Sequence, residues 1–201
     1  MLIIPSINAD NPIKGQTIIK VLRGFVSVAA IQIHSDTQNI SNFVKLFDRQ
    51  STELELFIHG ENHEARLDEI IKIHSDVNIG KVFFNEKNTD KVEQDLVNIR
   101  IFGINPGIII DKENYKKPGI INKFEFATIF VKENSDYIEI YRFIKNNEFK
   151  GTLMLNFGDT RVPEEVLQDV SIDGFYIDIT MNPMIKDTIS SYRRAANSIY
   201  L

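Results

Sequence analysis

The 201-residue sequence contains no cysteine. Disulfide bonds, thiol nucleophiles and thiolate metal sites are therefore excluded, and the absence fits a reducing cytoplasm. No run approaches the roughly 20 apolar residues that span a membrane. The N-terminus lacks the charged segment and the long apolar stretch of a signal peptide. We therefore expect a soluble, cytoplasmic protein with no membrane partner.

Positive charge and phosphate-binding motifs are also scarce. The formal net charge is −5, and lysine and arginine form no dense stripe, so a nucleic-acid partner is not expected. The sequence contains neither a Walker loop nor a G-x-G-x-x-G fingerprint, and no Ser-His-Asp set is recognisable by its spacing. ATP and dinucleotide chemistry therefore have no support in the sequence.

Short apolar runs rich in Val, Ile and Phe recur along the chain, and most are continuous rather than alternating. Such runs are typical of strands that are buried on both faces, as in a parallel sheet. Eight strands are predicted: Leu2–Ile7, Val26–Ile33, Leu54–His59, Lys81–Phe84, Ile99–Ile104, Phe124–Val131, Thr152–Leu155 and Gly174–Ile179.

Segments with helical spacing fill most of the gaps between these strands. They cover residues 18–22, 40–47, 67–74, 89–97, 138–144, 163–170 and 184–200, whereas 111–122 is expected to be a loop or a distorted helical turn. Alternation of strand and helix predicts a parallel sheet, and eight units predict a compact (β/α)8 TIM barrel, an α/β fold, as a single domain over residues 1–201. A doubly wound open sheet is the main alternative.

Three short motifs resemble, in order and spacing, those of the ribulose-phosphate 3-epimerase family. They are IIPSINAD (Ile3–Asp10), similar to the family's first strand, GINPG (Gly103–Gly107), similar to its fifth-strand end, and LNFGDTRVPEEV (Leu155–Val166), similar to its seventh-strand end. The beginning MLIIP also resembles the histidine-biosynthesis phosphoribosyl isomerases. The later glycine-rich phosphate loops of those isomerases have no good counterpart in this chain.

The resemblance implies a barrel that binds a small sugar phosphate and epimerises or isomerises it by removing a proton next to a carbonyl. In the family, two aspartates act as acid and base. These aspartates and two histidines hold a divalent metal (Zn, Fe or Mn), which stabilises an enediolate. Inverting a carbon requires a proton-transfer group on each of its faces.

The metal positions of this sequence depart from the family pattern. On the second strand Gln32 replaces a metal-binding histidine and His34 replaces a catalytic aspartate, with Asp36 two residues further on. On the third strand Phe57 takes the place of the second histidine. His59, two residues later, points to the same side of the strand. His34 and His59 are therefore the candidate metal ligands, and Asp36 is a candidate catalytic residue.

The remaining candidates lie at the other predicted strand ends. Asn156 stands where the second catalytic aspartate belongs, and Asp159 lies nearby on the loop, so both join the catalytic candidates. The predicted sixth-strand loop, 132–136, has no glycine for a phosphate cradle. Candidate substrate-binding residues are Ser6, Asn8, Asn105, Gly158 and Arg161.

Other interpretations of these residues stay open. His34 and His59 can instead be polar strand-end residues hydrogen-bonded to loops, and His63 and His74 are expected at the surface or at a helix cap. Since asparagine cannot accept a proton, a catalytically inactive barrel of the same descent, with a binding or regulatory role, is the second hypothesis. An unrelated carbohydrate-processing barrel is the third.

The six Tyr and fourteen Phe leave room for the apolar interface of a homo-oligomer, which the sequence does not localise.

Overall fold

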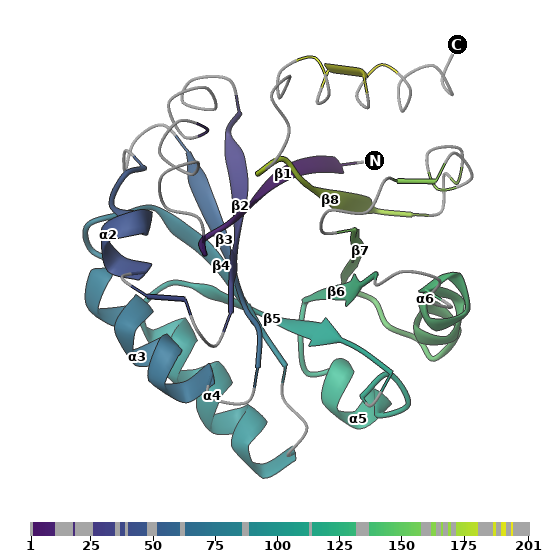
Figure 1. Ribbon diagram of the computed structural model, residues 1–201. Helices are drawn as coiled ribbons and strands as arrows, with labels where there is room; N and C mark the ends of the chain where they lie inside the picture. The colour runs from purple at the N-terminus through teal and green to yellow at the C-terminus, as the bar shows by residue number, and fades with distance from the viewer. Residues whose placement is uncertain are drawn as a thin grey trace.

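Eight parallel strands form a closed barrel in the computed structural model (Figure 1). The structure describes residues 2–10, 18, 26–34, 37–38, 40–47, 52–60, 63–85, 89–112, 114–131, 137–157, 162–163, 166, 169, 172–180, 187, 190–191 and 194. The strands are β1 (Leu2–Asn8), β2 (Val28–Ile33), β3 (Glu53–Ile58), β4 (Ile79–Phe84), β5 (Asn105–Ile110), β6 (Phe126–Phe130), β7 (Thr152–Asn156) and β8 (Gly174–Asp178).

Each strand pairs in parallel with the next along the chain, and β8 pairs with β1 to close the ring. In that last ladder Leu2 lies opposite Gly174 and Ser6 opposite Asp178. Closure leaves no exposed sheet edge. The predicted (β/α)8 TIM barrel is therefore confirmed, and the open sheet is excluded.

The helices lie outside the ring of strands (Figure 1). They are α2 (Ile40–Val44), α3 (His63–Ile73), α4 (Thr89–Ile101), α5 (Pro118–Ile121) and α6 (Tyr137–Asn146). Most residues of the predicted helices 18–22, 163–170 and 184–200 fall outside the described residues. In the part of the chain that is described, no helix is long and apolar enough to cross a membrane.

Two apolar layers follow from the alternation of side chains along each strand. One set of strand residues packs outward against the helices. On α6 it meets Ile140, Tyr141 and Ile144, two of which, Tyr141 and Ile144, belong to the spacing that predicted this helix. The other set fills the barrel, where the rings of Phe57 and Phe83 stack with centroids 4.4 Å apart. Burial on both faces explains why the strands read as continuous apolar runs.

The fifth strand is the one misplaced by the sequence. Ile99 and Ile101 belong to α4, and the strand starts at Asn105 rather than ending near it. The Pro106-Gly107 pair looks like a turn but opens the strand. Pro106 precedes the first pair between β5 and β6, which is Gly107 with Phe126. A proline at the very start of a strand costs little, because the ladder there does not require its missing N–H.

Gly107 is required by the packing of the barrel interior. A Cβ at this position would lie 2.4 Å from Cδ1 of Phe83, which is buried and held in its stack with Phe57. We expect Gly107→Ala to lower the free energy of unfolding by about 1–3 kcal/mol, the usual cost of overpacking. Gly119→Ala is the matched control, since a Cβ there meets nothing within 4 Å. Urea unfolding checks this, and equal stability of the two variants would contradict it.

A polar cluster lies inside the barrel among these aromatic rings. Glu55 is 1% exposed; one carboxylate oxygen accepts from Lys81 Nζ, and the other accepts from the Tyr176 hydroxyl at 2.5 Å. Lys81 Nζ also lies 3.8 Å from a carboxylate oxygen of Glu53 and 4.9 Å from the ring centroid of Phe126. Burial, and then the charge of Glu55, raise the pKa of Tyr176 well above its ordinary value. The phenol therefore stays protonated and donates to the carboxylate.

Removing the cation should leave Glu55 buried and uncompensated. We expect Lys81→Met to lower the free energy of unfolding by about 3–5 kcal/mol, and Lys81→Met combined with Glu55→Gln to recover part of that loss. Lys123→Met is the control, because its ion pair with Glu93, at 2.6 Å, is on the surface. Urea unfolding of the variants measures the differences. A loss no larger than that of the control would show that the buried pair is not required.

Candidate functional site

The side chains at the carboxyl ends of the strands form the face that we call the mouth of the barrel. It comprises Asn8, His34, His59, Asn85, Asp111, Phe130, Asn156 and Asp178. Four strands meet there at the amide of Gln32, which is 3% exposed. Gln32 Nε2 donates to Ser6 Oγ at 2.7 Å, while its Oε1 faces His59 Nε2 at 2.6 Å and Asn156 Nδ2 at 3.3 Å.

The local sequence places Gln32 inside the barrel. On β2, Val28, Ala30 and Gln32 alternate with outward residues, and the small Ala30 lies next to Ser6 on β1. A buried amide is costly unless its groups are hydrogen-bonded. Ser6 and Asn156 are both fully buried and supply two of the partners. The side chain is therefore held in one orientation.

This orientation fixes the tautomer of His59. Because Gln32 Oε1 can only accept, the His59 Nε2 that faces it carries the hydrogen. In the neutral ring, Nδ1 then carries the lone pair. The edge of the Phe130 ring, 5.0 Å away by centroids, packs against the same imidazole. Gln32 thus orients the His59 ring and determines which ring nitrogen carries the hydrogen.

His34 lies beside His59 at the mouth. The two rings are stacked, with centroids 4.8 Å apart and planes within 14°, and the His34 side chain is 35% exposed. The backbone N–H of His34 donates to Thr37 Oγ1 at 2.9 Å, and that hydroxyl also bonds to Asp10. Arg66 Nη2 on α3 holds the Thr37 carbonyl at 2.7 Å. The loops after β1 and β2 are therefore tied to α3 around His34.

The two histidines do not fit a shared metal ion as they are placed. A histidine binds a metal through a lone pair in its ring plane, at about 2.0–2.1 Å. Parallel stacked rings direct these lone pairs along separate planes, and Nε2 of His59 is engaged by Gln32. No group of three or more His, Asp or Glu in the described ranges is placed to hold a metal. Asp36 and Asp159 lie outside those ranges, so the metal stays a prediction.

Asn8 and Asp178 serve the backbone of the rim. Asn8 Oδ1 accepts from the N–H of Asp10 at 2.9 Å, and the N–H of Asn8 donates to Thr180 Oγ1 at 2.8 Å. Asp178 Oδ1 accepts from the N–H of Thr180 at 2.6 Å. The two bonds in which the side chains of Asn8 and Asp178 accept from the N–H two residues later are typical of Asx turns. The expected ligand role of Asn8 therefore stays a prediction.

A second polar corner at the mouth was not anticipated from the sequence. Asn85 Nδ2 donates to Asp111 Oδ2 at 2.6 Å, and the fully buried Asn114 donates to Asn85 Oδ1 at 3.1 Å. The backbone N–H of Asn114 bonds Asp111 Oδ1 at 3.0 Å. Asn85 and Asp111 directly follow the buried strands β4 and β5. The predicted strand Lys81–Phe84 already carried this signal for Asn85, whereas Asp111 was hidden by the misplaced fifth strand.

Asn105 does not belong to the mouth. It starts β5, is exposed, and donates to the carbonyl of Gly80 at 3.2 Å at the opposite end of the barrel. Its predicted location at the end of the fifth strand is wrong, because the turn-like Pro106-Gly107 shifted the predicted strand. Asp36, Gly158, Asp159 and Arg161 lie outside the described residues.

His63 was expected at the surface or as a cap and is instead 5% exposed. Its Nε2 lies 3.1 Å from Asp95 Oδ2, and its ring stacks on Phe84 with centroids 5.1 Å apart. A histidine at the start of α3 reaches the core here because Asp95 on α4 provides a polar partner. His74, by contrast, is half-buried and caps the Ile71 carbonyl at 2.6 Å.

No protein-family model matches the sequence, and no curated protein matches it. Among solved structures, the tryptophan synthase α-subunit from Pyrococcus furiosus is similar over 98% of this chain and 97% of that chain, with a TM-score of 0.69 and 12% identity. A chain of the tryptophan synthase complex from the same organism has a TM-score of 0.65 and 15% identity over the same shares. At this identity the likeness establishes a common fold and nothing more.

The hydrogen bond to Gln32 predicts the state of His59 in solution. We expect neutral His59 to be protonated at Nε2, because Gln32 Oε1 can only accept. The ¹⁵N chemical shifts of its ring nitrogens measure this directly. In Gln32→Leu we expect the preference to weaken, while the shifts of His74 stay unchanged as an internal control. A neutral His59 protonated at Nδ1 in the unaltered protein would refute the assigned network.

Proposed function

We propose that the mouth of the barrel binds a small sugar phosphate and isomerises it by moving a proton next to its carbonyl. The observation that carries this proposal is the stacked pair of His34 and His59, with His59 oriented by Gln32. Enzymes built on this fold have their active sites at the carboxyl ends of the strands. Histidine is the side chain best suited to proton transfer near neutral pH.

The chemistry needs a base and a donor. Nδ1 of His59 would take a proton from the carbon next to the carbonyl, so that a C–H bond breaks, an N–H bond forms and the electron pair moves onto the carbonyl oxygen. A ring N–H of His34 would donate to that oxygen as its negative charge develops. His34 would give that proton to the oxygen and then take the hydroxyl proton from the carbon that lost its hydrogen, so that this carbon becomes the new carbonyl. Return of the proton from His59 to the former carbonyl carbon completes an aldose–ketose isomerisation.

The location of the two histidines favours isomerisation over epimerisation. They follow the neighbouring strands β2 and β3, so they would approach a substrate from one side. Inverting a carbon requires a second proton-transfer group on the opposite face. On β7 the corresponding described residue is Asn156, an amide, and the carboxylate of Asp111 is engaged by Asn85 and Asn114.

Support for a phosphorylated substrate comes from the resemblance of IIPSINAD and LNFGDTRVPEEV to the ribulose-phosphate 3-epimerases. Gly158 and Arg161 in the second motif remain the predicted phosphate contacts. The cytoplasmic location and the homo-oligomer likewise remain predictions.

A catalytically inactive barrel that binds such a ligand is the second candidate. It is favoured by Gln32 and Asn156, two amides at positions where the family carries a metal ligand and a catalytic acid.

The experiment is proton exchange in heavy water with a panel of aldose and ketose phosphates. We expect solvent deuterium to enter one substrate, and His59→Gln to slow this at least about 100-fold, the usual contribution of a general base. His34→Gln should also slow it. His74→Gln is the control, since His74 directly follows α3 and its ring bonds to the Ile71 carbonyl.

The other outcomes distinguish the candidates. Ligand-induced thermal stabilisation without any exchange would support the inactive barrel and overturn the isomerase. Neither exchange nor stabilisation with any sugar phosphate would overturn both. Exchange that survives both histidine substitutions would mean that other residues transfer the proton. Metal analysis of the purified protein, with activity measured before and after chelation, tests the predicted divalent metal separately.

A further inference from the structure

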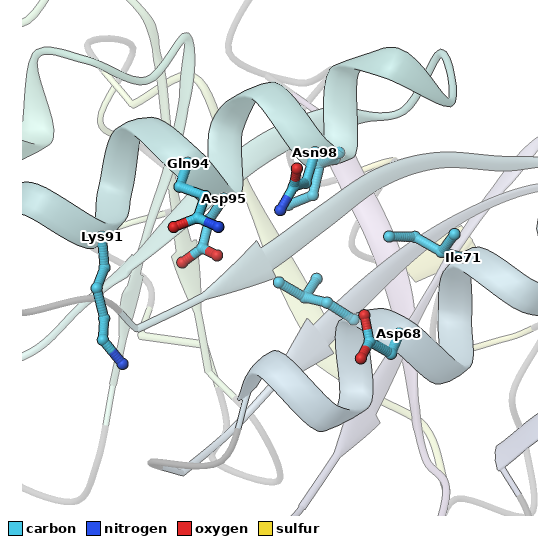
Figure 2. Close-up of a pocket in the computed structure, with 8 residues that line it drawn as sticks. Asp68, Ile71, Lys91, Gln94, Asp95 and Asn98 are labelled. Atoms are coloured by element: carbon cyan, nitrogen blue, oxygen red, sulfur yellow. The ribbon is translucent and has the colours of Figure 1, made fainter.

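A groove on the outer surface of the barrel lies between α3 and α4 and belongs to a different part of the molecule from the mouth. Its volume is about 270 Å³, and it is lined by Leu67, Asp68, Ile71, Lys91, Gln94, Asp95, Asn98 and Ile99. Figure 2 shows Gln94 and Asp95 extending from α4, and Asp68 and Ile71 from α3, into the space between the helices. The groove thus combines polar walls with aliphatic contacts.

The deepest polar group in the groove is the carboxylate of Asp95. The residue is 8% exposed, and its Oδ2 is held by His63 Nε2 at 3.1 Å. Asp95 also lines the groove, so this buried carboxylate is reachable from it. A carboxylate has about four acceptor sites on its two oxygens, and a single imidazole engages only one of them. Asp95 therefore retains capacity to accept hydrogen bonds from a donor in the groove.

The charge of the groove favours a cation as that donor. Asp68 on α3 and Asp95 on α4 carry negative charge on opposite walls, while Lys91 is the one cationic residue among the described residues of the lining. The side-chain carbonyls of Gln94 and Asn98 add two more acceptors on the α4 wall. An ammonium group has three donors and no acceptor, so it matches this set better than a neutral or anionic group.

The aliphatic lining and the volume limit the rest of the ligand. Leu67, Ile71 and Ile99 offer apolar contact along the groove. The volume lies just below the range of roughly 300–1,000 Å³ for drug-sized ligands. The groove therefore suits a short unbranched chain better than a ring system.

We propose that this groove binds a small aliphatic ammonium ion. Its ammonium group would lie between Asp68 and Asp95, and its carbon chain would lie against Leu67 and Ile99. The proposal is independent of the chemistry at the mouth, because none of these residues touches the Gln32 network. It assigns the buried pair of His63 and Asp95 a role in ligand binding as well as in joining α3 to α4.

The test uses 1-butylammonium as the probe and 1-butanol as its uncharged counterpart, each titrated into the full-length protein. Methyl and side-chain amide NMR signals of Ile71, Ile99, Gln94 and Asn98 report binding. We expect saturable shifts with millimolar affinity for butylammonium and none for butanol, while the ring signals of His34 and His59 stay unchanged. Raising the salt concentration should weaken the binding, because part of it is electrostatic.

Two variants distinguish binding by the groove carboxylates from a general effect of the net charge of the protein. Asp68→Asn should weaken butylammonium binding roughly fivefold, as expected for the loss of one partly exposed ion pair. Glu139→Gln, which removes the same charge from the distant α6, should leave the affinity unchanged. Asp95→Asn should also weaken binding. If Asp95→Asn unfolds the protein, the comparison of Asp68→Asn with Glu139→Gln still tests the proposal.

Three results would overturn the proposal. One is the absence of shifts up to tens of millimolar butylammonium. Another is an equal response to butanol, which would show that the groove selects apolar chains and not the charge. The last is an equal loss of butylammonium affinity in Asp68→Asn and Glu139→Gln, which would show that the binding depends on the net charge of the chain and not on this groove.

Discussion

The buried amide of Gln32 joins β1, β2, β3 and β7 at one point inside the barrel. Its carbonyl accepts from two side chains and its nitrogen donates to a third, so its neighbours are fixed relative to one another. Burying this amide costs little free energy only if neighbouring strands provide hydrogen-bond partners for both its oxygen and its nitrogen. The orientation of His59, and with it the stacking of His34, depends on this requirement being met.

The barrel interior alternates between polar and aromatic layers. The cluster of Glu55, Lys81 and Tyr176 lies towards the start of the strands, and the Gln32 network lies at their ends. Between them the stacked rings of Phe57 and Phe83 fill the centre. Both rings are buried, and the buried polar groups on either side find their hydrogen-bond partners within the protein. The polar residues of these two clusters therefore occupy positions where another strand offers a hydrogen-bond partner.

The fold could be predicted from the sequence because strand and helix alternate and the strands carry long apolar runs. Seven strands are close to their predicted positions. The fifth failed because Pro106-Gly107 looks like a turn, while the steric reason for Gly107, the ring of Phe83, comes from the neighbouring strand and is invisible in the local sequence. That shift also moved Asn105 to the wrong end of the barrel and concealed Asp111.

The site was harder to predict for the same physical reason. His34, His59, Ser6 and Asn156 follow from their location at strand ends. The tautomer of His59 and the stacking of the two rings depend on contacts across the barrel, between residues as far apart as 32 and 156. The burial of His63 depends on Asp95, 32 positions away. Spacing within one element carries no information about such partners.

Thr37 has a consequence for the motions of the rim. Its hydroxyl joins Asp10 to the backbone of His34, and its carbonyl is held by Arg66. The N–H of His34 therefore donates to the hydroxyl of a residue that is itself held by contacts to the loop after β1 and to α3. Such coupled contacts open as one cooperative unit. The rim beside the histidines would thus be protected against hydrogen exchange as a block, and more strongly than an exposed set of loops.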